Sequence, residues 1–197
     1  MKILAFSDLH ASKSHAAEIV AASSGADLVL GAGDFCNMRH GLDAALGLLD
    51  WLCAPMLAIP GNAESPEELA EALRDGTTML HARSCKVGGL TFFGLGCAVP
   101  LTPFGDWSVD LSEEQAEMLL TTCEHADVLL LHSPPKGVAD RTSAGLSVGS
   151  VAIHAAIERI QPRLAVCGHI HDCWGATGQI GATRVVNLGP TPNWFDL

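Results

Sequence analysis

The sequence predicts an α/β fold in which residues 1–197 form one domain around parallel strands. Short apolar runs alternate with helical segments in the first part of the chain, and a polar or glycine-containing turn follows each run. The middle of the chain carries several short strands in succession, which indicates a second sheet. At 197 residues the chain is long enough for one well-buried core, so one domain with two sheets is favoured over two domains.

The N-terminal part of the chain repeats a strand, a turn and a helix. We expect strands at residues 3–6, 28–30 and 56–59, and helices at 15–23, 42–52 and 66–73. The third helix has the clearest start, because Ser65 is placed to cap it and Glu68 completes a capping box three residues later.

The remaining part of the chain begins with three strands, at residues 78–81, 85–87 and 90–95, and Gly88 and Gly89 indicate a hairpin. A helix at 113–123, capped at Ser112, precedes a strand at 128–131. A helix at 150–160 then precedes strands at 164–167 and 183–187. The apolar chain end at Trp194 and Phe195 packs either against the domain or against a second subunit, so the sequence leaves a homo-oligomer open.

Composition excludes several classes of protein. With 48% hydrophobic and 17% charged residues, the chain is an ordinary globular protein rather than a disordered one. A net charge of -11 disfavours a nucleic-acid partner, which needs a basic surface. No apolar stretch reaches the ~20 residues of a membrane span, and Asp8 and His10 interrupt any signal peptide. The seven cysteines form no CxxC pair, so we expect reduced thiols and a cytoplasmic location.

The informative polar residues fall directly after apolar runs. In open α/β sheets the carboxyl ends of the strands meet at one crevice, where ligands bind. We therefore expect two Asp, four His and one Asn to gather there from five separate segments: Asp8 and His10, Asp34 after Gly33, Asn62 after Gly61, His132, and His169 and His171 after Gly168.

Such a cluster favours metal binding. Buried Asp and His without partners carry a desolvation cost and repel like charges, and a cation removes both penalties. Carboxylate and imidazole suit Mn, Fe, Zn or Co. Seven side chains are too many for one catalytic zinc, which takes three protein ligands and water, whereas two ions sharing a bridging carboxylate fit the count. The alternative, a metal-free core with polar strand ends by chance, is disfavoured by the order of the motifs.

Taken in order, the motifs DxH, GD, GN, H and GHxH resemble the calcineurin-like metallophosphoesterases over roughly residues 1–190, and the segments 132–137 and 186–190 resemble small bacterial and archaeal members. The resemblance implies a sandwich of two mixed β-sheets flanked by helices, and two divalent metal ions, with Mn favoured and Fe, Zn, Co or Ni as alternatives. It also implies one metal held by Asp8, His10, Asp34 and His171, with Asp34 bridging to a second held by Asn62, His132 and His169.

The implied function is hydrolysis of small phosphate esters or nucleotides by in-line attack of a hydroxide bridging the two metals. Asp34 would position the hydroxide, and Asn62 would also contact the substrate; Arg39 and His40 are further candidate substrate contacts. A phosphodiester substrate is favoured, and a phosphomonoester is the alternative. A nuclease is disfavoured by the acidic charge.

The chain departs from the family at the third motif. There the usual histidine, which assists the leaving group, is replaced by Ala63, and Glu64 stands where the acidic partner of that histidine would be. General acid catalysis contributes about 10²–10⁴-fold, so we expect slow turnover of esters with poor leaving groups. His15, Arg39 and His40 are candidate substitute acids. The same departure allows a second hypothesis, a non-catalytic scaffold that binds proteins, although a scaffold has no reason to keep all seven ligands.

Three other expectations concern residues near the predicted site. The loop at residues 140–150 is expected to cover the substrate, with Lys136 and Arg141 near a phosphate, although both also fit ordinary surface charges. The cysteines are expected to fill the core, and Cys36, two residues after Asp34, is the one near the predicted site for which sensitivity to oxidation is the alternative. The histidines outside the motifs, His81, His125 and His154, are expected to be structural or solvated.

Overall fold

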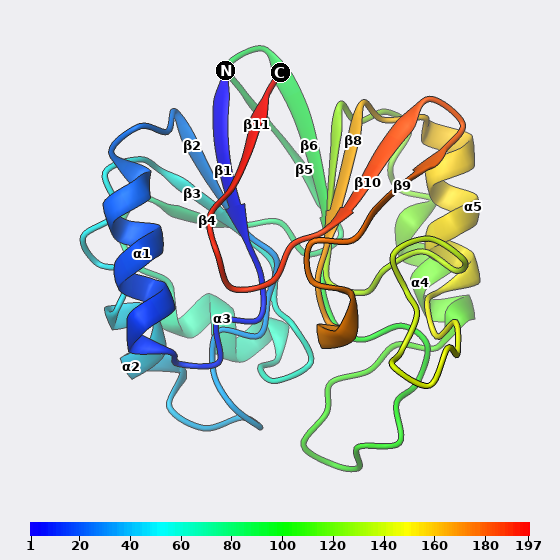
Figure 1. Ribbon diagram of the computed structural model, residues 1–197, viewed down its shortest axis with the longest axis horizontal. Coiled ribbons are helices and arrows are strands. Elements are labelled where there is room, and N and C mark those ends of the chain that lie inside the picture. The colour runs from blue at the N-terminus through cyan, green and yellow to red at the C-terminus, as the bar shows by residue number, and fades with distance from the viewer.

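Two mixed β-sheets lie face to face in the computed structural model, which describes residues 1–197, and helices cover the outer face of each sheet (Figure 1). The α/β/β/α sandwich predicted from the sequence is therefore confirmed. None of the helices is long and apolar enough to span a membrane.

The first sheet has the strand order β11-β1-β2-β3-β4. Its four parallel strands are β1 (Lys2–Phe6), β2 (Leu28–Gly31), β3 (Met56–Ala58) and β4 (Thr77–Met79), and β11 (Asn193–Asp196) pairs antiparallel with β1. Helices α1 (Lys13–Ser23), α2 (Leu42–Gly47) and α3 (Pro66–Ala72) belong to this half of the molecule.

The second sheet has the strand order β5-β6-β7-β8-β10-β9. Its strands are β5 (Arg83–Val87), β6 (Leu90–Leu95), β7 (Val128–Leu131), β8 (Leu164–Cys167), β9 (Thr177–Ile180) and β10 (Thr183–Asn187). The two outer strands, β5 and β9, are antiparallel to their neighbours, and the inner strands are parallel. Helices α4 (Glu113–Leu120) and α5 (Val151–Ile160) cover its outer face, and a short 3-10 helix, η1 (His171–Cys173), follows β8.

Alternating side chains of each inner strand enter two different cores. In β7, Val128 and Leu130 pack between the sheets, whereas Leu129 and Leu131 pack beneath the helices of the second half. In β1, Ile3 lies in the core between the sheets, and Leu4 packs toward the helices of the first half. Strands that bury both faces read as continuous apolar runs, which is why these segments are clear in the sequence.

Several element boundaries depart from the sequence prediction. The second helix ends at Gly47 rather than at residue 52, because glycine in a helix costs about 1 kcal/mol relative to alanine. The predicted capping box of Ser65 and Glu68 is present at the start of α3. Strands β9 and β11 were not predicted. Because β11 pairs with β1 and buries Phe195, the apolar chain end packs against its own domain.

Candidate metal centre

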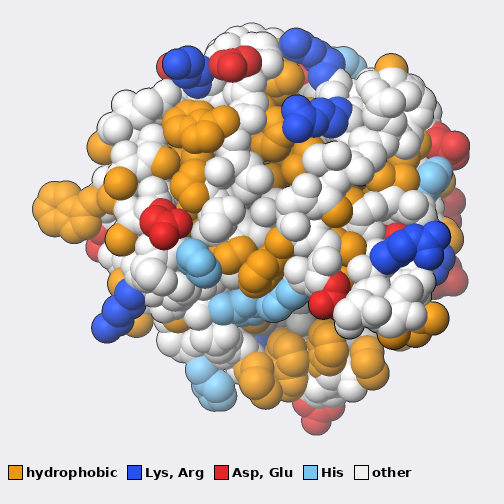
Figure 2. All heavy atoms as spheres, in the orientation of Figure 1, with side chains coloured by type: hydrophobic (Ala, Val, Ile, Leu, Met, Phe, Trp, Pro, Cys, Tyr) orange, Lys and Arg blue, Asp and Glu red, His pale blue; other side chains and the backbone are white.

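The seven predicted ligands lie in the loops that follow β1, β2, β3, β7 and β8. A hydrogen bond from the backbone amide of His169 to Asp8 Oδ1 (3.0 Å) joins the ends of the two sheets. Figure 2 shows histidine side chains grouped in the middle of this face of the molecule, with hydrophobic side chains next to them.

A first group consists of Asp8, His10 and His171, whose ligand atoms all lie within 4.8 Å of one another. His10 donates from Nδ1 to the carbonyl oxygen of Cys36 (3.0 Å), which directs its Nε2 toward the other two residues. That Nε2 lies 3.2 Å from Nε2 of His171. Two ring nitrogens at this distance need a proton or a cation between them, so the arrangement fits a metal ion.

A second group consists of Asp34, His132 and His169, with the same 4.8 Å limit between ligand atoms. His132 is fully buried and donates from Nδ1 to the carbonyl oxygen of Ala32 (2.8 Å). Its Nε2 therefore faces the site, where it lies 3.1 Å from Oδ1 of Asn62. Two acceptor atoms that face each other in a buried site favour a cation there.

Asp34 lies between the two groups. Its Oδ2 is 3.6 Å from His10 Nε2 in the first group, and its Oδ1 is 3.5 Å from His132 Nε2 in the second. The backbone amide of Ala63 donates to Oδ1 (2.8 Å). Burial raises the pKa of the Asp34 carboxyl, but the neighbouring His132 and His10 outweigh it and lower the pKa overall, so the carboxylate is charged at neutral pH.

Asn62 is held with its oxygen toward the second group. Its Nδ2 donates to Ser108 Oγ (2.9 Å), which leaves Oδ1 directed at His132. Ser108 in turn donates to Asp110 Oδ1 (2.6 Å). The neutral oxygen is therefore fixed from the loop that follows β6, a contact between residues far apart in the sequence.

Backbone geometry explains the residue types at the strand ends. Asp8, His10, Asp34 and His169 all have positive φ angles, between 46° and 67°. Asp and His are enriched in this left-handed region, which most side chains avoid. A Cβ on Gly61 would overlap Asp34 Oδ1, so only glycine fits before Asn62.

Burial and charge control the protonation of the second group. Burial lowers the pKa of His169 to about 3, with a further contribution from His132, so His169 is a neutral donor. Burial also acts to lower the pKa of His132, but the charges of Asp34 and Asp8 outweigh it and raise the pKa. A divalent cation would replace the proton that the carboxylates favour on His132.

The sequence model of a protein family, the calcineurin-like phosphoesterase superfamily domain, matches residues 1–196 of this chain. The chain belongs to this phosphoesterase family. A curated relative, metallophosphoesterase domain-containing protein 1 of Homo sapiens, is 36% identical over 88 residues, which are 43% of this chain and 27% of the human protein. The matched segment thus spans about a quarter of that relative.

Two solved structures share the phosphoesterase fold. TT1561 of Thermus thermophilus has a TM-score of 0.75 at 18% identity, covering 99% of this chain and 98% of that one. A dimetal phosphatase from Danio rerio has a TM-score of 0.65 at 12% identity, covering 96% of this chain and 88% of that one. At these identities the likeness establishes the fold of the phosphoesterase domain.

Glu64 joins the second and third motifs of this phosphoesterase instead of supporting a side chain at position 63. Its buried carboxylate accepts hydrogen bonds from the backbone amides of Gly61 (2.8 Å), Phe35 (3.3 Å) and Cys36 (3.3 Å). Burial, with the charge of Asp34, raises the pKa of Glu64 to about 7, although the amides act against this shift. The sequence indicated an acidic residue without a partner; the structure shows that its partners are backbone amides.

Ala63 is buried, and Trp107 packs against the small cluster that it forms with Cys36 and Ala45. A large side chain from the loop after β6 therefore packs against the cluster that contains Ala63, the position of the family histidine. Cys36 lies in the core as expected, and the alternative of oxidation sensitivity is disfavoured: its thiol is buried, and burial and the charge of Glu64 raise its pKa far above neutrality, so it stays protonated.

No hydrogen bond or ion pair joins the side chains of the other candidate residues to the predicted metal ligands. Arg39 makes two hydrogen bonds to the Glu68 carboxylate (2.7 and 2.8 Å), and His40 is exposed in a turn. His15 lies on α1. In the loop after β7, Lys136 donates to the carbonyl oxygen of Ser147 (2.6 Å) and Arg141 to that of Gly145 (3.1 Å), so both tie this loop together.

Sequence reasoning missed the role of Trp174. Its indole Nε1 donates to Asp8 Oδ2 (3.0 Å), and its ring lies 4.5 Å from the His171 ring at an interplanar angle of 34°. It therefore holds two residues of the first group at once. The sequence could have indicated this contact, because Trp174 comes three residues after His171 and one turn of 3-10 helix brings such residues together.

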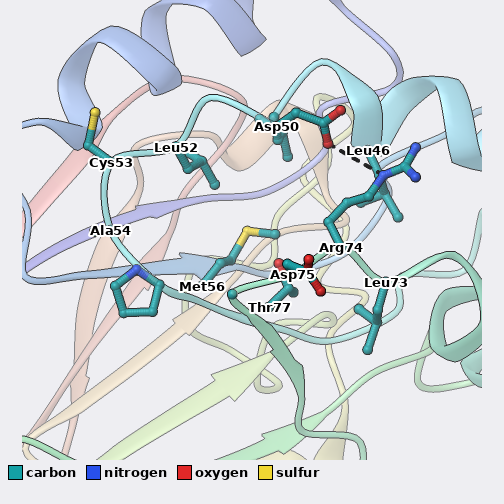
Figure 3. A pocket seen from close by; sticks show the side chains of 13 residues that line it. Leu46, Asp50, Leu52, Cys53, Ala54, Met56, Leu73, Arg74, Asp75 and Thr77 are labelled. Carbon is teal, nitrogen blue, oxygen red and sulfur yellow. Dashed lines mark ion pairs between the residues drawn. The ribbon is translucent and has the colours of Figure 1, made fainter.

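Two cavities differ in their relation to the site. One, of about 550 Å³, is lined by His169 and by the loops after β6 and β7. The other, of about 590 Å³, lies where β3 and β4 begin, at the end of the first sheet remote from the predicted ligands (Figure 3). There Arg74 pairs with Asp50 (3.4 Å) and with Asp43 (2.9 Å), so its charge is already compensated.

Proposed function

We propose that this phosphoesterase uses two divalent metal ions to hydrolyse small organic phosphate esters, with diesters preferred. The observation that carries the proposal is the position of Asp34, whose two carboxylate oxygens face different groups of donors. A single metal site would need only one of those groups. The name of the dimetal phosphatase that shares the fold supports a metal pair here as well.

In the proposed assignment, Asp8, His10, Asp34 and His171 hold one ion, and Asp34, Asn62, His132 and His169 hold the other. Carboxylate, amide and imidazole donors fit Mn, Fe, Zn, Co or Ni, and manganese is the ion that the resemblance to the family favours. When bound, such a pair supplies a water of lowered pKa and positive charge opposite the phosphate. We treat residues 1–197 as one functional domain. All seven cysteines are free thiols, which supports a reducing, cytoplasmic compartment.

The chain's own residues then orient the reaction. Hydrogen bonds to Cys36 and Ala32 fix His10 and His132 with their Nε2 atoms in the site. Ser108 keeps the oxygen of Asn62 directed inward, next to where a phosphate oxygen would bind. Ala63 cannot protonate a leaving group, so the leaving oxygen must depart as an anion or take its proton from water.

The preference for diesters rests on charge. A monoester carries two negative charges near neutral pH and needs more cationic side chains than a diester with one charge. Arg39, in the loop after β2, already pairs with the Glu68 carboxylate, so its charge is not available for the second negative charge of a monoester. Arg39 would contact a phosphate only after leaving Glu68.

Metal analysis combined with paired assays tests the proposal. We expect two equivalents of Mn per chain, and metal-dependent turnover of bis(p-nitrophenyl) phosphate that exceeds turnover of p-nitrophenyl phosphate and stops on chelation. Asp34→Asn should lose most of the bound metal and the activity, whereas Asp75→Asn, in an exposed turn, should keep both. A protein that binds no metal and turns over neither ester would overturn the enzyme and favour the protein-binding scaffold.

A further inference from the structure

A cleft of about 550 Å³ opens beside His169, the residue that it shares with the second group of donors. One wall is the segment from Val99 to Phe104, after β6, and the other is formed by residues 142–151 at the start of α5. Because His169 belongs to both the cleft and the donor group, a phosphate held at the donors would place its organic substituent within reach of this cleft.

Both walls of the cleft carry exposed hydrophobic side chains. Leu101 is 65% exposed and Phe104 48% on the first wall, and Val151 is 55% exposed on the second. Figure 2 shows hydrophobic side chains gathered next to the histidines on this face. Exposed apolar groups concentrated beside a reactive centre mark a binding surface for an apolar ligand.

The polar groups that line the cleft are already bonded within the protein. Glu113 accepts hydrogen bonds from Ser150 Oγ (2.7 Å) and from the amides of Val151 (3.0 Å) and Ala152 (2.9 Å). Thr102 Oγ1 donates to Asp110 (2.7 Å). Apart from the exposed Lys136 ammonium, which donates one hydrogen bond to the carbonyl oxygen of Ser147, these donors and acceptors are satisfied, so burial of apolar surface is the main source of affinity that the cleft offers.

Phe104, on the first wall, belongs to an aromatic pair. Phe104 stacks on Trp107 with ring centroids 5.5 Å apart at 10°, and its ring meets His169 at 6.4 Å and 67°. Trp107 rests on the cluster around Ala63, and Ser108 in the same loop bonds to Asn62. The pair is therefore held at a fixed position relative to the donors, on the side where the family histidine is absent.

We propose that this cleft, termed the aryl cleft, binds an apolar aromatic substituent of the phosphate ester against Phe104. The inference rests on the proposed function, because the phosphate is taken to bind at the metal centre. A flat ring suits the cleft because Phe104 lines it and stays half exposed, and aromatic pairs gain affinity beyond the area that they bury. The preferred substrates are then aryl phosphate esters rather than esters of small or polar alcohols.

Binding of three unreactive phosphonates to the Mn-loaded protein, measured by calorimetry, tests the aryl cleft without requiring turnover. Phenylphosphonate should bind about tenfold more tightly than methylphosphonate, the gain expected from burying most of one ring. Cyclohexylphosphonate, similar in size but without a flat face, should fall between them. Equal affinity for phenyl and methyl, equal affinity for phenyl and cyclohexyl, or no binding of any of the three would overturn the aryl cleft.

Variants on opposite walls locate the effect. Phe104→Ala and Val151→Ser should each reduce the preference for phenyl at least threefold and change methylphosphonate binding less than twofold. Met118→Ala, at a 65% exposed position on α4 outside the cleft, is the matched control and should change neither. Diester turnover is measured separately: turnover without a phenyl preference overturns only the cleft, and a phenyl preference without turnover overturns only the enzyme.

Discussion

Glu64 offers the sharpest test of how the site is held together. Its two carboxylate oxygens accept from three buried amides, those of Gly61, Phe35 and Cys36. A buried amide left without an acceptor costs about 1–3 kcal/mol. Two of the three contacts are long, at 3.3 Å, and the carboxylate itself carries a burial cost, so we take the low end of that range. Glu64→Ala should therefore lower the free energy of unfolding by about 3 kcal/mol.

Glu64→Gln separates shape from hydrogen bonding. Its amide oxygen can replace Oε1 and accept from Gly61 and Phe35, but its NH2 group then faces the amide of Cys36. The amide of Cys36 loses its acceptor and the NH2 group adds buried donors, so we expect a loss of about 1–2 kcal/mol, smaller than that of the alanine variant.

Urea unfolding at pH 8, with and without Mn, measures both variants. Glu71→Gln, on the exposed side of α3, is the matched control and should lie within about 0.5 kcal/mol of the wild type. The reasoning fails if the alanine variant is also that stable, or if the glutamine variant is the less stable of the two.

Three further predictions follow from other parts of the site. Because Ala63 supplies no proton, hydrolysis rates across a series of aryl esters should fall steeply as the leaving-group pKa rises; a flat series would reveal a substitute acid. Because the Trp174 ring lies against the His171 ring, Mn binding should quench tryptophan fluorescence, and Trp174→Phe should remove the quench while Trp194→Phe keeps it; an unchanged quench in the first variant contradicts the contact. In metal-free protein the raised pKa values of Glu64 and His132 mean that the folded state binds protons more tightly than the unfolded state. The free energy of unfolding should therefore fall as pH rises from about 6.5 to 8, and Mn should reduce that fall. A free energy of unfolding that rises over this window refutes the assignment.

The sequence predicted the inner strands better than the outer ones. β7 and β8 coincide with their predicted ranges, because strands buried on both faces must be apolar throughout. β9 and β11 were missed because they lie at sheet edges and carry polar or exposed residues, such as Gln179 and Asn193. Their strand character comes from pairing with β10 and β1, which a local pattern does not contain.

The polar strand ends were also visible in the sequence, because their residue types are set by chemistry that acts locally. A donor must be Asp, His or Asn, and the tight turns that carry it need glycine, as the Cβ that would strike Asp34 at Gly61 illustrates. The positions of Asp8, Asp34 and His132 along the chain were thus sufficient to predict a shared site.

The sequence by itself determined the family, the order of the strands that carry the donors and the chemistry of those donors. Only the tertiary structure decided how they are held: Asp34 between two groups, Glu64 on backbone amides, Trp174 on Asp8, and Trp107 against the cluster that contains Ala63. Each of these arrangements joins residues far apart in the chain, except for the hydrogen bond between Gly61 and Glu64. Trp174 and Asp8, for example, are separated by 166 positions. Such contacts depend on how the two sheets pack, and no local pattern of residue types specifies that packing.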